Sequence, residues 1–248
     1  KYPAGQLPPR LMKRLNGLMW VGLALALVGS IVALMQQTMV FFNASPQQVI
    51  SGGLWQVVRI GSRFGDVWNA RLVLLGLVAG IHAATLYYSS RSPRAVRPLW
   101  AAQTPLLALV VGASSINSHA AGSLIWPWVA VFVHWLHTLS VAFWVGGAAA
   151  LALVLAVALR PYEGPARADA LAAVMRRFSR LMVGAVALVI TSGIYNALNW
   201  FFTPADLATN YGTSMGLKLL MVLILLAIGG LHHLALHPER LAALQAGP

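Results

Sequence analysis

The stretch that decides the fold is WPWVAVFVHWLHTLSVAFWVGGAAALALVLAVAL, residues 126–159, which contains no Asp, Glu, Lys or Arg. A helix rises 1.5 Å per residue, so about 20 apolar residues cross the roughly 30 Å of hydrocarbon in a bilayer. This stretch is longer than one crossing requires. It therefore predicts a transmembrane helix that tilts or projects beyond the membrane, with Pro127 in its first turn.

Other apolar runs lie at 15–42, 67–88, 96–116, 181–200 and 214–236. The chain is 59% hydrophobic and only 9% charged, whereas a soluble domain carries roughly 25% charged residues. The sequence therefore predicts an all-α, polytopic transmembrane bundle of about six spans. We expect a basic N-terminal segment at 1–14, a transmembrane domain at 15–237 and a short tail at 238–248.

The charges indicate how the bundle is oriented. Lys and Arg number 17 against five Asp and Glu, and most of them lie before the first run, between the second and third, and between the fourth and fifth. Basic residues collect in cytoplasmic loops, so we expect both termini in the cytoplasm. Because these cations lie in short runs between apolar segments, we attribute them to membrane orientation and expect no nucleic-acid partner.

Several kinds of chemistry find no support in the residues. The chain has no cysteine, which excludes disulfides and thiolate metal sites. We find no Ser-His-Asp or paired-carboxylate arrangement and no phosphate-binding loop motif, so we expect a protein that is not an enzyme and does not use ATP directly. Any metal site must use His, Met, carboxylate or backbone groups.

Histidines within membrane spans are the main functional candidates, because ionisable groups are costly there. His134 and His137 are three residues apart and share one face of a helix, and His119 lies in the preceding turn. We expect these three to converge near the outer surface, where imidazole nitrogen is a good ligand for copper or zinc. His82 and His232 form a deeper set, and for a lone histidine simple hydrogen bonding to a neighbouring helix is the alternative.

Other residues give weaker signals. Met35 and Met39 are four residues apart, and thioethers select Cu(I), although most methionines only fill gaps in packing. Five polar side chains could line an aqueous path, orient a histidine or make interhelical hydrogen bonds: Gln36, Gln37, Asn117, Asn196 and Asn199. Lys218 either extends to the membrane surface or lies near the ion path.

Four sequence blocks, taken in order, resemble the CopD copper-resistance family. They are RFGDVWNARLVLL at 63–75, SHAAGSLIWPWVAVFVHWLHTLSVAFWVGG at 118–147, RRFSRLMVGAVALVITSGIYNAL at 176–198 and YGTSMGLKLLMVL at 211–223. The resemblance covers most of the chain, about residues 30–236. It maps the histidine positions of the family onto His119 and His137, with His134 as an added candidate.

The resemblance implies a multi-pass protein of the bacterial inner membrane that moves copper ions between periplasm and cytoplasm, often with a CopC-type periplasmic copper-binding partner. Family members commonly have about eight spans and this chain begins with Lys, so we expect further helices upstream. Two alternatives stay open. One is an electron-transfer subunit that binds haem b through two histidines on separate spans, and the other is a non-catalytic subunit of a larger membrane complex.

Overall fold

The computed structural model describes residues 9–89, 91, 93–199, 205 and 208–235, and every regular element within them is a helix. Six of these helices are long and apolar enough to cross a membrane. The elements are α1 (Pro9–Phe42), α2 (Pro46–Ser51), α3 (Leu54–Gly61), α4 (Arg63–Ser89), α5 (Pro93–Ile116), the 3-10 helix η1 (His119–Gly122), α6 (Pro127–Ala158), α7 (Gly164–Leu198) and α8 (Asn210–Ala235). The prediction of an all-α bundle with six spans is confirmed.

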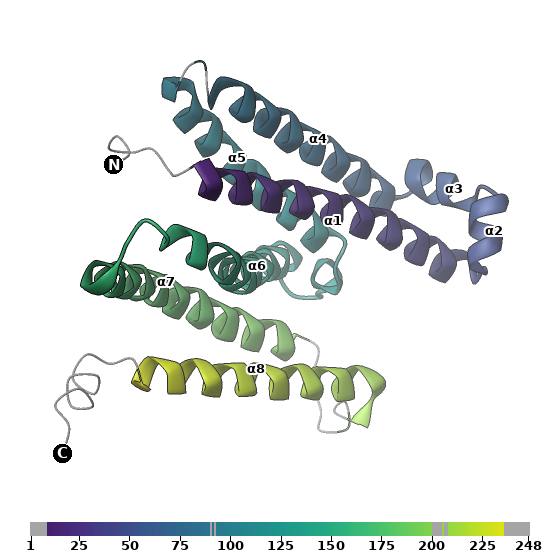
Figure 1. Ribbon diagram of the computed structural model, residues 1–248. Coiled ribbons are helices and arrows are strands. Elements are labelled where there is room, and N and C mark those ends of the chain that lie inside the picture. The colour runs from purple at the N-terminus through teal and green to yellow at the C-terminus, as the bar shows by residue number, and fades with distance from the viewer. Residues whose placement is uncertain (1–8, 90, 92, 200–204, 206–207, 236–248) are drawn as a thin grey trace.

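The long helices pack as two groups that follow the order of the chain (Figure 1). Neighbours in sequence form the closest pairs, α4 with α5 and α6 with α7. Helix α1 contacts both α4 and α6, and α5 contacts α6, so these contacts join the two groups. Helix α8 lies along the far side of α7 (Figure 1).

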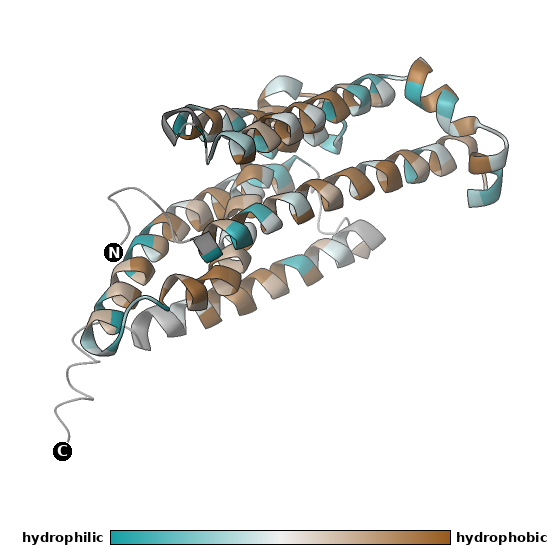
Figure 2. Cartoon of the chain, turned by 45° about the horizontal axis from the view of Figure 1, so that its top comes forward, coloured by the Kyte–Doolittle hydropathy of each residue, from teal (hydrophilic) through white to brown (hydrophobic). Residues whose placement is uncertain are grey.

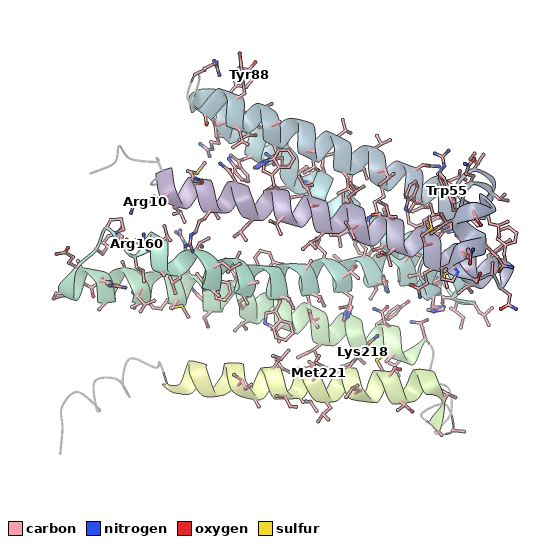
Figure 3. All side chains as sticks on the ribbon, turned by 45° about the vertical axis from the view of Figure 1, so that its right-hand side comes forward. Arg10, Trp55, Tyr88, Arg160, Lys218 and Met221 are labelled. Atoms are coloured by element: carbon pink, nitrogen blue, oxygen red, sulfur yellow. The ribbon has the colours of Figure 1, made fainter. Side chains whose placement is uncertain are left out.

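Successive spans run in opposite directions. Arg10, Tyr88 and Arg160, from three different connections, lie toward one end of the bundle, and Trp55 lies at the other end (Figure 3). Since basic residues favour the cytoplasmic side, the end with Arg10 and Arg160 is the predicted cytoplasmic end, and the end with α2, α3 and η1 is called the outer end here. This orientation stays a prediction.

Two helices begin earlier than their apolar runs. Helix α7 starts at Gly164, whereas the apolar run starts at 181, and α1 starts at Pro9, whereas the run starts at 15. The segment ADALAAVMRRFSR before residue 181 is rich in Ala and Arg, which are strong helix formers, so the helix continues past the hydrocarbon. Residues 1–8 and 236–248 lie outside the described part of the chain, so the predicted terminal segments are largely untested.

The outer connection between α1 and α4 is built from two short helices. Ser45 caps α2: its backbone N–H donates to Gln48 Oε1 at 2.8 Å, and its Oγ accepts from the Gln48 N–H at 3.4 Å. This reciprocal pair is a capping box, and Pro46 follows in the first turn. Gly53, at φ 65°, then allows the left-handed turn into α3.

Hydrophobic residues predominate along the spans (Figure 2), and many of their large apolar side chains are exposed. Large side chains such as Leu25 and Leu223, which are 66% and 62% exposed, face outward on α1 and α8. Lipid is the solvent that suits such a surface, because a soluble protein rarely exposes apolar patches of this extent. The buried core between α1, α4 and α5 centres on Leu23, Val78 and Val110.

Candidate functional site

A pocket of about 90 Å³ lies at the outer end of the second helix group, between η1, α6 and α7. Two imidazoles and two carboxamides share its wall. Its lining residues are Ser118, His119, Ala120, Ala130, His134, Asn196 and Asn199. Two of the three outer histidines predicted from the sequence, and the predicted Asn196, therefore meet in one place.

The short helix η1 positions His119 at the mouth of this pocket. Ser118 precedes η1, and its Oγ donates to the Ser115 carbonyl at 2.7 Å and accepts from the Ala120 N–H at 3.3 Å. Beneath η1, Ala120 is buried against Ala130 of α6. These contacts hold the turn against the bundle, while the side chain of His119 is exposed.

A hydroxyl from α5 orients His134. The Nδ1 atom of His134 lies 2.9 Å from Ser115 Oγ, and Ser115 is fully buried. Ser115 Oγ is also 3.5 Å from the hydroxyl of Thr138, which donates to the His134 carbonyl at 2.8 Å. With Nδ1 engaged by α5, Nε2 is the ring nitrogen that can bind a metal ion, which is the usual arrangement of an oriented metal-ligating histidine.

His137 faces α7. Its Nδ1 lies 3.2 Å from the Val189 carbonyl and 3.1 Å from Ser192 Oγ. A carbonyl only accepts, and the Ser192 hydroxyl donates to the Leu188 carbonyl. Nδ1 of His137 therefore carries the hydrogen, and Nε2 keeps a lone pair available to a metal.

The three outer histidines lie near one another without closing into a single centre. His119 and His134 line the same pocket, and His137 follows His134 by three residues on α6. In the described part of the chain, however, no three His, Asp or Glu side chains come close enough together to hold a metal ion. Residues three apart on a helix differ by about 60° in direction, which is enough to turn His134 toward α5 and His137 toward α7.

The other predicted residues lie away from the pocket wall. Met35 and Met39 are half-buried on α1, and Gln36 is exposed on the same helix. Asn117 donates its side-chain N–H to the Phe64 carbonyl at 3.2 Å, which ties the end of α5 to α4. Lys218 is exposed on α8 (Figure 3).

His82 belongs to the first helix group. It is fully buried on α4, and its ring meets Trp20 of α1 and Trp100 of α5 edge-on, with ring centroids 5.4 and 5.7 Å apart. Neither ring nitrogen has a hydrogen-bond partner among the described residues. His232 falls in the last turn of α8, where side chains lie outside the described part of the chain, so the predicted deeper pair stays a prediction.

Ser115, Ser118 and Ser192 were absent from the candidates drawn from the sequence, whereas Asn199 was among them. Asn199 accepts from the Ser123 hydroxyl at 3.2 Å and donates to the Tyr195 carbonyl at 2.8 Å, so it fixes the end of α7 against the turn that follows η1. A signal existed for the serines: polar residues within apolar spans often bond across helices. Their partners could not be assigned without the helix packing.

Comparisons with known proteins show which family the chain resembles. Residues 172–248 match the family model CopD, described as Copper resistance protein D. The chain is 32% identical over 191 residues to "Inner membrane protein YebZ" of Escherichia coli (strain K12), covering 77% of this chain and 61% of that protein. It is also 32% identical over 116 residues to "Copper transport protein CutJ" of Bacillus subtilis (strain 168), covering 45% of this chain and 20% of that protein.

The chain thus spans about three fifths of the first relative and one fifth of the second. No solved structure matches it. The family match covers α8 and most of α7, and the match to the first relative extends over most of the chain. Together with the six apolar helices, these matches support a multi-pass inner-membrane protein similar to the CopD family.

Proposed function

We propose that this chain moves copper ions across the inner membrane and that the outer pocket, defined by His119, His134, Asn196 and Asn199, receives the ion. The observation that carries the proposal is the meeting of two imidazoles and two carboxamides in about 90 Å³ at one end of a transmembrane bundle. The family description and the printed name of the second relative support copper as the ion.

The ligands suit an ion that passes through. Nε2 of His134 and the imidazole of His119 supply nitrogen, and the carboxamide oxygens of the two asparagines add weak ligands. A transport site must bind well enough to admit an ion and weakly enough to release it. Because two histidines leave the coordination incomplete, the pocket meets both requirements better than a closed cage.

His137 supplies the next step inward. It lies three residues further along α6 from His134, about 4.5 Å along the helix axis, and its Nε2 keeps a lone pair. We propose that the ion is transferred from His134 toward His137 as it leaves the outer pocket. Transport, with no bond made or broken in the cargo, is the activity proposed for the chain.

The mouth of the pocket also fits delivery by another protein. His119 is exposed at the outer end, where a CopC-type periplasmic copper-binding protein could present its ion. A volume of about 90 Å³ is well below the 300–1,000 Å³ of ordinary small-molecule pockets, which favours an ion over a haem at this site.

Purified protein in liposomes that enclose a copper-sensitive dye tests the proposal. Wild type should admit copper, and the double variant His119→Ala/His134→Ala should lose at least nine tenths of that rate. Ser114→Ala is the matched control, because among the described residues the hydroxyl of Ser114 bonds only to the Val111 carbonyl of its own helix. Equal rates in the double variant and the control would refute the pocket assignment. A haem absorption band that is lost in the same double variant would favour the electron-transfer alternative.

A further inference from the structure

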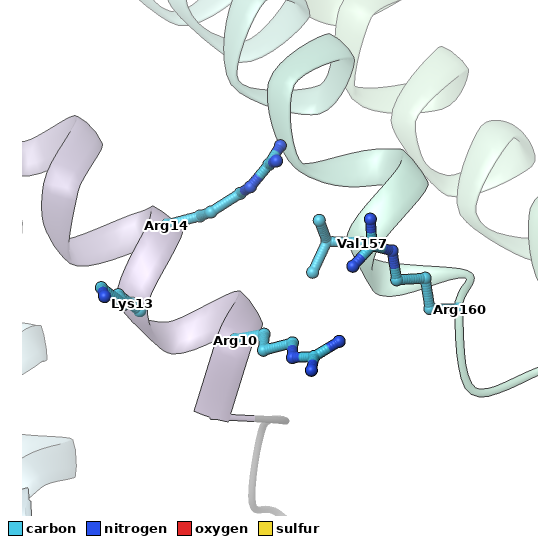
Figure 4. Close-up of a pocket in the computed structure, with 5 residues that line it drawn as sticks. All are labelled: Arg10, Lys13, Arg14, Val157 and Arg160. Carbon is cyan, nitrogen blue, oxygen red and sulfur yellow. The ribbon is translucent and has the colours of Figure 1, made fainter.

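A second pocket, called the basic pocket here, lies at the opposite end of the bundle. Its volume is about 430 Å³, and Arg10, Lys13, Arg14, Val157 and Arg160 line it. Arg10 and Arg14 extend from the first turns of α1 toward α6, and Arg160 approaches from just beyond the end of α6 (Figure 4). Three cationic side chains from α1 and one from the turn after α6 therefore line one space.

The charge in the basic pocket is uncompensated by the described residues. The described acidic residues are Asp66, Glu163 and Asp169, and none of them forms an ion pair with the four cations. Arg14 donates from Nη1 to the Leu153 carbonyl of α6 at 2.6 Å. This bond fixes one cation at the pocket while like charges crowd around it, so the arrangement favours an anion between them.

The position of the basic pocket indicates which kind of anion would bind there. Arg10 is the first residue of an apolar span, and Arg160 comes two residues after the end of another, Pro127–Ala158. Both therefore lie where hydrocarbon gives way to headgroups, the level at which phospholipid phosphates sit. The pocket is also walled by the buried Val157, and the side chain of Leu153 next to it is 51% exposed, which offers an apolar surface for an acyl chain.

We propose that the basic pocket binds the phosphate of an anionic phospholipid, which links α1 to α6. Guanidinium groups donate in a planar fork that matches phosphate oxygens, so Arg10 and Arg160 can hold one phosphate from opposite sides. Basic pockets between transmembrane helices commonly hold anionic headgroups in this way. Such a lipid would connect the two helix groups at the end of the bundle away from the histidines.

Thermal unfolding of the full chain in phosphatidylcholine nanodiscs tests this site. Adding phosphatidylglycerol should raise Tm by several degrees, and inorganic phosphate at the same concentration should raise it far less. The double variant Arg10→Gln/Arg160→Gln should lose most of the phosphatidylglycerol-dependent rise. The control Arg176→Gln/Arg177→Gln removes two exposed cations of α7, which also lie toward the predicted cytoplasmic end. This control should keep the phosphatidylglycerol-dependent rise in Tm.

Native mass spectrometry gives a second readout that does not depend on Tm. Wild type and the control should retain bound phosphatidylglycerol, and the single variant Arg160→Gln should retain several-fold less. Equal lipid retention, or equal Tm shifts in the two double variants, would overturn the site. A Tm rise with inorganic phosphate equal to that with phosphatidylglycerol would overturn the lipid as its ligand.

Discussion

The hydrogen bond between Ser115 and His134 gives a quantitative test of how the outer pocket is built. Ser115→Ala removes a buried hydroxyl that lies 2.9 Å from Nδ1 of His134 and leaves that nitrogen without its partner. An unsatisfied buried polar group costs about 1–3 kcal/mol, and His134 is only half-buried, which places the cost near the lower end. We therefore expect a loss of about 1 kcal/mol in the free energy of unfolding.

The effect on copper should be larger than this stability cost suggests. Loss of the group that orients a metal-binding histidine typically weakens metal affinity about 10- to 100-fold. We expect Ser115→Ala to bind copper about tenfold more weakly than wild type, which corresponds to about 1.4 kcal/mol. Competition against a coloured copper chelator in detergent measures this affinity.

The neighbouring Ser114→Ala is the control for both measurements, since its hydroxyl bonds to the Val111 carbonyl within α5. It should bind copper as wild type does. If Ser115→Ala and Ser114→Ala show the same affinity, the hydroxyl does not hold His134 in a ligating position, and the reasoning fails.

Three further predictions concern packing and protonation. Gly193→Ala places a Cβ 3.3 Å from Cε1 of His137, so it should displace the ring and slow copper uptake several-fold in the liposome assay. Gly112→Ala places a Cβ 2.7 Å from Nε1 of Trp135 and should lower the free energy of unfolding by about 1–3 kcal/mol in chemical denaturation. Gly184→Ala, with open space at its Cβ, is the control for both and should be neutral or slightly stabilising. Copper affinity should fall as the pH is lowered, because protons compete for imidazole nitrogen, and an affinity that stays flat down to the pH at which the protein unfolds would contradict histidine ligands.

The spans could be predicted because the bilayer imposes a length and an apolar composition that a single sequence displays directly. The ends of helices that extend beyond the hydrocarbon were harder to predict, as the start of α7 shows. Outside the membrane, helix propensity rather than hydropathy decides where a helix begins. The length of α6 was correctly predicted to exceed one crossing: it has 32 residues.

The candidate site was predictable only as a set of residue types. The spacing of His134 and His137 indicated a common face, but which neighbouring helix each ring meets depends on packing between segments far apart in the sequence. Ser192, for example, is 55 residues from His137. Similarly, nothing in the sequence around His82 showed that Trp20 and Trp100 would enclose it.

X-ray absorption spectroscopy of the copper-loaded protein tests the central claim most directly, because it counts the imidazole groups bound to the metal. The proposed pocket predicts two imidazole ligands in wild type, one in His134→Ala, and no tightly bound copper in His119→Ala/His134→Ala. Copper that keeps the same number of imidazole ligands and the same occupancy in the double variant would contradict the assignment of the ion to this pocket.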